Sequence, residues 1–168
     1  MGIQIIALNT QNSDYYTLCL RKFFLKNSHF RKGYRFKDHH EGNYLKQLQI
    51  MPVSCVRLRH EEERSIPKVQ IKMCLMGEST DMELNPKLKK LKAYTETVEG
   101  NAYNPIFKSP KVMTIKSKCP ESSFVIIEVE NCGITALPMS HIKKGYRGVK
   151  LYNKYFEYNG SKVLCWIE

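Results

Sequence analysis

Basic side chains gathered in three clusters are the residues of this sequence best suited to chemistry, and that chemistry is the binding of anions. Because residues two apart on a strand share a face, Lys116 and Lys118 point the same way and can join Lys90 and Lys92 on one concave surface. Such a surface attracts an anionic membrane leaflet by roughly 1 kcal/mol for each basic residue near it. We expect this contact at Lys90, Lys92, Lys116, Lys118, Lys143, Lys144 and Arg147. The alternative is that these side chains only keep the domain soluble.

The chain as a whole carries the same bias, with a formal net charge of +11 at pH 7. A charge of this sign favours an anionic partner, which can be a phospholipid surface, a nucleic acid or an acidic protein. Between Tyr15 and Arg35, tyrosine and phenylalanine residues interleave with arginine and lysine residues, as stacking platforms do in a groove that binds nucleic acid. A nucleic acid is therefore one alternative partner.

The sequence provides no recognisable ligand set for a transition metal. The six cysteines stand singly, with no Cys-x-x-Cys pair and no histidine spacing of a zinc site. His39 and His40 lie in a polar stretch with no further residues to complete a site. We predict solvated histidines and reduced, mostly buried cysteines with a structural role.

A chain of 168 residues with 42% hydrophobic content is long enough for one domain with a core, plus an appendage. No stretch approaches the roughly 20 consecutive apolar residues of a membrane-spanning helix. No basic segment precedes an apolar run at the start, as it would in a signal peptide. The expected location is cytoplasmic, with peripheral contact to a membrane.

The elements that must position these residues change in character along the chain. Residues 3–8, IQIIAL, are almost continuously apolar, which is typical of a strand covered on both faces in a parallel α/β sheet. Residues 10–50 are polar, aromatic and basic, and we predict a loop or short helix, one strand near Gly33–Phe36 and then a linker. From Met51 onward, short alternating segments separated by turns predict seven or eight strands of an antiparallel sandwich. Their expected positions are 53–58, 69–75, 93–98, 112–116, 124–129, 146–151 and 163–167.

The opening segment resembles the end of the so-called Y half of phosphoinositide-specific phospholipases C. That family has a Gly-x-Gln-x-Val-Ala-Leu-Asn-x-Gln strand, which GIQIIALNTQ follows here, and then Phe-Leu-x-Asn-Gly-x-x-Gly-Tyr-x-Leu-Lys-Pro. The residues that fit the two motifs in order are Gly2, Gln4, Ala7, Leu8, Asn9, Gln11, Phe24, Leu25, Asn27, Gly33, Tyr34 and Lys37. In this resemblance the aromatic residues of the segment pack inside a barrel, which makes nucleic acid the weaker alternative.

The remainder resembles the C2 domain that follows in the same family. Met51-Pro52 opens its first strand, and Val98–Pro105 is similar to its Asn-x-Phe-x-Pro turn. Pro120–Val129 and Leu137–Leu151 are similar to its later strands, the second through Lys-Gly-Tyr-Arg-x-Val-x-Leu. The implied fold is mainly β: a C2-type antiparallel β-sandwich preceded by the last one or two strands of a TIM-like (β/α) barrel. The implied domains are a remnant of the Y-box barrel at 1–37, a linker at 38–50 and the sandwich at 51–168.

The resemblance implies a role in lipid metabolism and signal transduction, and it limits what this chain can do alone. The family's catalytic histidines and the carboxylates that hold its catalytic calcium lie upstream of the matched motifs. We therefore expect a hydrolase family member that is inactive alone and contains no cofactor. The complete enzyme would cleave a phosphoinositide to diacylglycerol and an inositol phosphate, and the missing catalytic half is one expected partner. The alternative is a stand-alone, non-catalytic C2-like module that docks on anionic membranes or on a protein.

The loops of the sandwich predict independence from calcium. A calcium-binding C2 domain collects about five aspartates on two loops, because calcium requires 6–8 oxygen ligands. The whole sequence contains only Asp14, Asp38 and Asp81. The first loop has Glu61-Glu62-Glu63, which we interpret as a solvated loop tip, and the expected third loop, Asn131–Leu137, has no acid.

Overall fold

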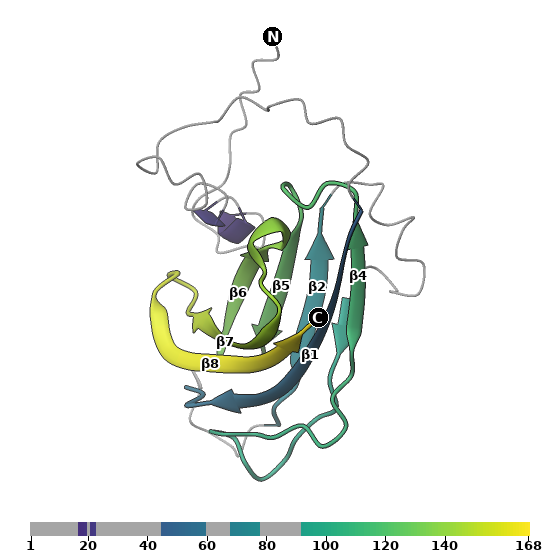
Figure 1. Cartoon of the computed structure of the whole chain (residues 1–168). Helices are drawn as coiled ribbons and strands as arrows, with labels where there is room; N and C mark the ends of the chain where they lie inside the picture. Colours follow the sequence, from purple (N-terminus) through teal and green to yellow (C-terminus); the bar gives the residue numbers. More distant parts are fainter. Residues whose placement is uncertain (1–16, 20, 23–44, 60–67, 78–91) are drawn as a thin grey trace.

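In the part of the chain that the structure describes, eight antiparallel strands form one hydrogen-bonded sheet that folds over into a two-layer sandwich (Figure 1). The computed structural model describes residues 17–19, 21–22, 45–59, 68–77 and 92–168. The strands are β1 (Lys46–Val56), β2 (Ile71–Met76), β3 (Lys92–Tyr94), β4 (Met113–Ser117), β5 (Phe124–Val129), β6 (Gly133–Pro138), β7 (Gly145–Tyr152) and β8 (Tyr158–Ile167). A 3-10 helix, η2 (Met139–His141), follows β6. The order across the sheet is β3-β2-β5-β6-β7-β8-β1-β4.

The fold divides into layers at the junction of β6 and β7. These two strands, both fully described, are paired only at Ile134 and Tyr152, whereas β5 and β6 are paired along six successive positions. One layer is thus β3-β2-β5-β6 and the other is β7-β8-β1-β4. Figure 1 shows β1, β7 and β8 in front of β2, β5 and β6. We call the β6–β7 junction the seam.

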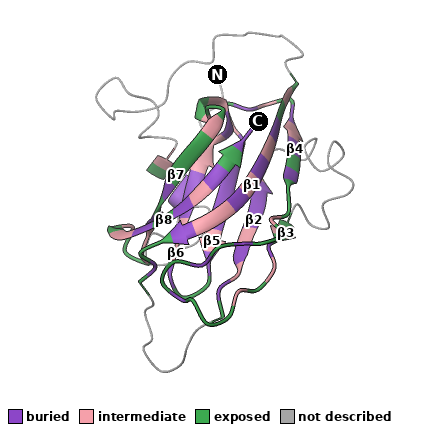
Figure 2. Ribbon diagram, turned by 60° about the horizontal axis from the view of Figure 1, so that its bottom comes forward, coloured by how far each residue is buried: buried purple, intermediate pink, exposed green. Residues whose placement is uncertain are grey.

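The main core lies between these layers and uses the alternate side chains of each strand. Strand β4, at one edge, buries Met113 and Ile115 and exposes Thr114, as a strand with one solvated face should. Strand β5 differs, because five of its six residues are buried (Figure 2). Val125, Ile127 and Val129 enter the main core, while Phe124 and Ile126 point to the opposite face. A strand with this burial needs a second covering layer.

The structure confirms the predicted sandwich and corrects several boundaries. The prediction at 124–129 coincides with β5, and the other six predicted strands overlap described strands. Strand β1 begins at Lys46 rather than after Met51, because residues 46–50 pair with β4. They therefore belong to the sandwich rather than to the expected linker. Strand β8 likewise begins at Tyr158, and the segment at 93–98 is strand only to Tyr94, with one further bridge between Val69 and Val98.

One predicted loop is a strand. The segment expected to be the third loop, Asn131–Leu137, mostly forms β6, which pairs with β5 from Gly133 onward. Residues 130–132 alone turn between the two strands, and Asn131 takes a left-handed φ of 55° there. The short alternation of Ile134, Thr135 and Ala136 is a weak strand signal, and the resemblance placed a loop at this point.

Other predictions fall on residues that the structure does not describe. They are the strands at 3–8 and Gly33–Phe36, the solvated His39 and His40, the glutamate run 61–63 and all three aspartates. Within the described ranges, no helix is long and apolar enough to cross a membrane.

Candidate functional site

The outer face of the β2-β5-β6 layer is apolar, although it points away from the main core. Its buried side chains are Cys74 from β2, Phe124 and Ile126 from β5, and Ala136 from β6. Met76 and Ile134 extend the face at its margins. We call these residues the outer face. An apolar surface of this kind on a soluble domain marks a contact with another element.

A helical segment at residues 17–19 and 21–22 provides the cover. Leu18 is only 2% exposed and forms one buried cluster with Cys19 and the outer face. The thiol of Cys19 lies 3.9 Å from the sulfur of Met76. Figure 1 shows this segment beside β5 and β6. The short helix considered for residues 10–50 therefore exists in part.

Two cations extend this contact to the hairpin between β7 and β8. The guanidinium of Arg21 lies 4.3 Å from the centre of the Phe156 ring, and Lys22 Nζ lies 4.0 Å from that of Tyr152. Such cation–π contacts contribute about 0.5–1 kcal/mol each at exposed sites. The helical segment thus contacts both layers, on either side of the seam.

Four of the predicted lipid-contact residues lie at one end of the sandwich, which we call the basic end. Lys118 directly follows β4, and Lys143, Lys144 and Arg147 lie at the start of β7. Ser117 at the end of β4 pairs with Lys46. The Lys46 ammonium donates hydrogen bonds to the carbonyls of Met139 (2.8 Å) and Ser140 (3.3 Å). Because Lys46 pairs with the end of β4 and its ammonium binds the segment after β6, it holds these two segments together.

The other described contact residues that were predicted lie on the two edge strands of the sandwich. Lys116 on β4 is half-buried, and its side chain points to the opposite face of the strand from the buried side chains of Ile115 and Ser117. Lys118 is exposed and lies just beyond the end of β4, so the shared side expected for Lys116 and Lys118 stays a prediction. Lys92 belongs to β3, the edge strand of the other layer, which lies on the side of the sandwich away from the seam, as β4 does. Lys90 lies outside the described residues, so the expected concave surface of four lysines stays a prediction.

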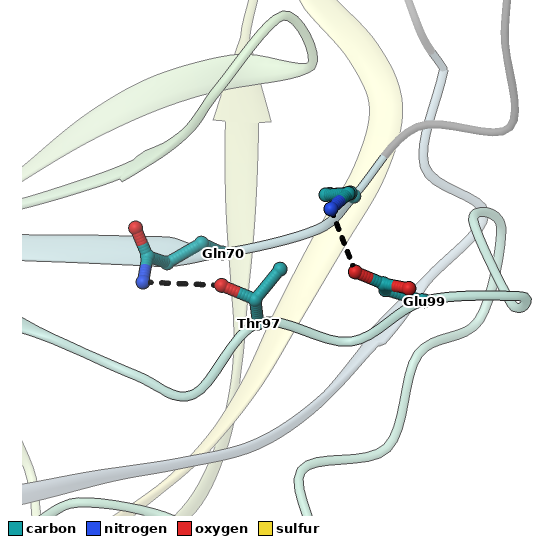
Figure 3. Close-up of polar contacts among 4 residues, drawn as sticks. Gln70, Thr97 and Glu99 are labelled. Carbon is teal, nitrogen blue, oxygen red and sulfur yellow. Dashed lines mark hydrogen bonds and ion pairs between the residues drawn. The ribbon is translucent and has the colours of Figure 1, made fainter.

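At the opposite end of the sandwich, described carboxylates form an ion pair and a hydrogen bond within the chain. Lys68 forms an ion pair with Glu99 at 2.9 Å, and this contact raises the pKa of Lys68. Nearby, the Gln70 side-chain amide donates to the Thr97 hydroxyl at 3.4 Å (Figure 3). The Glu96 carboxylate accepts a hydrogen bond from the Ser109 amide at 2.9 Å. These contacts close the connection between β3 and β4 onto the start of β2.

The same end lacks the oxygen-rich arrangement of a calcium site over the stretches that the structure describes. The β5–β6 turn contributes only one carboxylate, Glu130, and the Asn159 side chain donates to the carbonyl of Cys132 beneath it. Among the described residues, no three His, Cys, Asp or Glu side chains gather in a group that could hold a metal. Glu96 and Asn159 instead form hydrogen bonds with backbone groups, and Glu99 pairs with Lys68.

All six cysteines are free thiols, and five of them are buried. Cys119 is the one that is partly accessible. The predicted structural role is thus confirmed for the five, two of which, Cys19 and Cys74, lie in the contact between the helical segment and the outer face.

The phospholipase C PLC21 of S. officinalis is similar to this chain, with a TM-score of 0.72 and 26% identity over 98% of the chain. The structure of the chain is thus similar to that of a phospholipase C C-terminal region. PLC21 of L. pealei gives a TM-score of 0.61 and 24% identity over 76% of the chain. The chain spans only 22% and 16% of the lengths of these two phospholipases C.

The sandwich has the fold of a C2 domain. A C2 domain of a plant extended synaptotagmin 1 has a TM-score of 0.50 and 14% identity, covering 72% of this chain and 91% of that domain. No family model matches the sequence, and the comparison with curated proteins found no significant match. The likeness to phospholipase C is therefore carried by structure together with the motifs along the sequence.

Proposed function

We propose that this chain acts as the C-terminal portion of a phosphoinositide phospholipase C, in which the C2-like sandwich braces the catalytic barrel. In the complete enzyme the barrel hydrolyses a phosphoinositide to diacylglycerol and an inositol phosphate at the cytoplasmic face of a membrane. The catalytic half comes from outside the matched motifs, and this chain alone is inactive. The sandwich contributes a peripheral membrane contact that needs no calcium.

The observation that carries this proposal is the burial of Leu18 and Cys19 on the outer face. These two residues lie between the two halves of the Y-half motif, so they belong to the barrel side of the resemblance. A fully buried leucine stabilises a contact by roughly 2–5 kcal/mol, as judged from the cost of its truncation. We infer that this contact holds Leu18 and Cys19, on the barrel side of the resemblance, against the sandwich.

Cysteine alkylation tests the brace, because Cys19 and Cys74 are buried by it and Cys119 is partly accessible. We expect N-ethylmaleimide to label Cys119 at least 100-fold faster than either of the two, measured by peptide mass spectrometry. Leu18→Asp places a carboxylate in the contact and should accelerate labelling of Cys19 and Cys74 at least tenfold. Cys55 and Cys165, between the layers, should stay protected and so report an intact sandwich.

Arg21→Asp is the matched control, because Arg21 is exposed on the same segment and loses only its contact with the Phe156 ring. Labelling of Cys19 should change less than about twofold in this variant. If Cys19 of the unmodified chain reacted as fast as Cys119, the sandwich would not hold this segment. The stand-alone docking module would then be the better proposal.

A further inference from the structure

A cavity of about 420 Å³ opens at the seam, where a single residue pair joins β6 to β7. Its apolar lining includes Leu137 at the end of β6, Val149 on β7 and Ile167 at the end of β8. Lys22 of the helical segment contributes to the rim. The volume lies within the range of about 300–1,000 Å³ that is typical of sites for one small molecule.

The charge of this cavity is entirely of one sign. Lys22, Lys143, Arg147 and Lys150 line it together with His141, and no carboxylate is among the described lining residues. A cluster of cations beside an apolar wall fits a molecule that has an anionic head and an apolar body. A free inorganic anion would leave Leu137 and Val149 in contact with water, so it matches only half of the lining.

The rim is held in place before any ligand arrives. Arg147 donates hydrogen bonds to the carbonyls of Lys143 (3.2 Å) and Lys144 (2.5 Å). The hydrogen bonds from Lys46 to the carbonyls after β6 fasten the other end of the same connection. Lys22 is positioned over the Tyr152 ring. A preformed rim lowers the entropic cost of binding.

We propose that this cavity binds one anionic phospholipid, with its phosphate among Lys143, Arg147 and Lys150 and its glycerol and first acyl carbons against Leu137 and Val149. This inference rests on the proposed membrane contact and deepens it. The contact becomes a stoichiometric site at the seam rather than a diffuse attraction of the whole basic surface.

The test is calorimetric titration of the full 168-residue chain with dihexanoyl phosphatidic acid below its micelle concentration. Dihexanoyl phosphatidylcholine and glycerol phosphate are the comparison probes, because the first lacks the net charge and the second lacks the chains. We expect one site for phosphatidic acid and at least tenfold weaker binding of either comparison probe. Equal binding of glycerol phosphate would show an anion site without a lipid role and would overturn the proposal.

Two double variants with the same change in charge separate a site from a diffuse field. Lys143→Glu with Lys150→Glu alters the rim, whereas Lys108→Glu with Lys111→Glu alters exposed lysines that do not line the cavity. The rim variant should lose at least tenfold in affinity for phosphatidic acid, and the control variant less than twofold. Because all four side chains are exposed, both variants should keep the wild-type Tm. Equal losses in the two variants would contradict the proposal.

Binding to vesicles distinguishes a failure of this site from a failure of the proposed function. If the chain sediments with anionic vesicles but does not bind dihexanoyl phosphatidic acid, the membrane contact stands and the seam site is wrong. If it binds the short-chain lipid but not vesicles, the seam site stands and the membrane contact is wrong.

Discussion

Cys55 and Cys165 are thiols enclosed between the two layers of the sandwich. Burial raises the pKa of Cys165 to about 12. Burial also raises the pKa of Cys55, to which the neighbouring Cys165 and Cys132 thiols contribute further. A thiolate is therefore disfavoured at both positions, and the two residues behave as small apolar side chains.

This predicts a loss of stability in alkali. Below pH 9 the folded and unfolded chains both hold the two thiol protons; above it the unfolded chain releases them and the folded chain does not. The free energy of unfolding should fall between pH 9 and pH 12, and Cys165 should contribute about 1 kcal/mol per pH unit. In Cys165→Ala, urea unfolding at several pH values should show a slope that is shallower by this amount. An unchanged slope would show that Cys165 ionises without resistance in the folded state.

Single-residue properties are the easiest to predict from the sequence. The buried, reduced state of most cysteines follows from their solitary spacing inside apolar segments, and Cys74 between Met73 and Leu75 is an example. The alternation of Ile115, Lys116 and Ser117 between the two faces of β4 follows from strand periodicity alone. The cation–π contacts of the helical segment could not be predicted, because they depend on how that segment lies across the β7–β8 hairpin.

At the scale of elements, the seam depends on Gly133 at the start of β6. Its φ is +144°, and a Cβ added there would lie 2.9 Å from the carbonyl oxygen of Tyr152 and 3.0 Å from the Asn159 side-chain nitrogen. Tyr152 is also the residue that pairs with Ile134. Glycine is thus required where β6 approaches β7 most closely.

Gly133→Ala should destabilise the chain by about 2–4 kcal/mol, because backbone strain and a clash with the backbone act together. Gly145 is the matched control, since its φ is +97° but nothing lies within 4 Å of an added Cβ. Gly145→Ala should cost only the strain, about 1–2 kcal/mol. Thermal and urea unfolding measure both variants, and equal losses would show that the close approach has no energetic weight.

The strands are predicted well wherever one face is solvated, and less well elsewhere. Alternation locates β4 to within one residue, because Met113 and Ile115 enter the core and Thr114 does not. The sequence does not predict strand β6, because only its Thr135 and Ala136 are buried, which gives a weak alternation. The family motif also indicates a loop at this point. The early start of β1 depends on pairing with β4, which lies far away in the sequence.

At the scale of the whole molecule, the net charge of +11 is unevenly distributed. Lys46, Lys118, Lys143 and Lys144 meet at the basic end, while carboxylates of the other end fasten Lys68 and the Ser109 amide. Cations that gather at one end of a domain act on anionic surfaces over about one Debye length, roughly 8 Å at physiological ionic strength.

The chain should therefore sediment with vesicles that contain phosphatidylserine at about one lipid in three, a strongly anionic surface, and not with vesicles of phosphatidylcholine alone. The bound fraction should be the same in EDTA and in calcium, because no carboxylate cluster is present in the described loops. It should fall at least tenfold between about 0.05 and about 0.5 M NaCl, since surface charge supplies the attraction. Binding that required calcium would contradict this assignment, and no binding at all would favour a purely structural role.

The overall assembly is the least predictable level. The family motifs indicate a barrel segment followed by a sandwich, but a sequence pattern does not say which face of the sandwich the upstream segment covers. The one indication lies in β5, where FVIIEV is apolar at nearly every position, as strands covered on both faces are. This pattern indicates that something covers the outer side of β5, but it does not identify the covering segment.

The single backbone link at the seam has a consequence for how the molecule opens. Each four-stranded ladder is hydrogen-bonded within itself, and Ile134 with Tyr152 is the one described pair that joins the ladders. Backbone hydrogen bonds therefore hold each ladder together, while the side chains of the one shared core join the two ladders. A molecule that widened the seam would have to separate core side chains but would break only one described backbone pair.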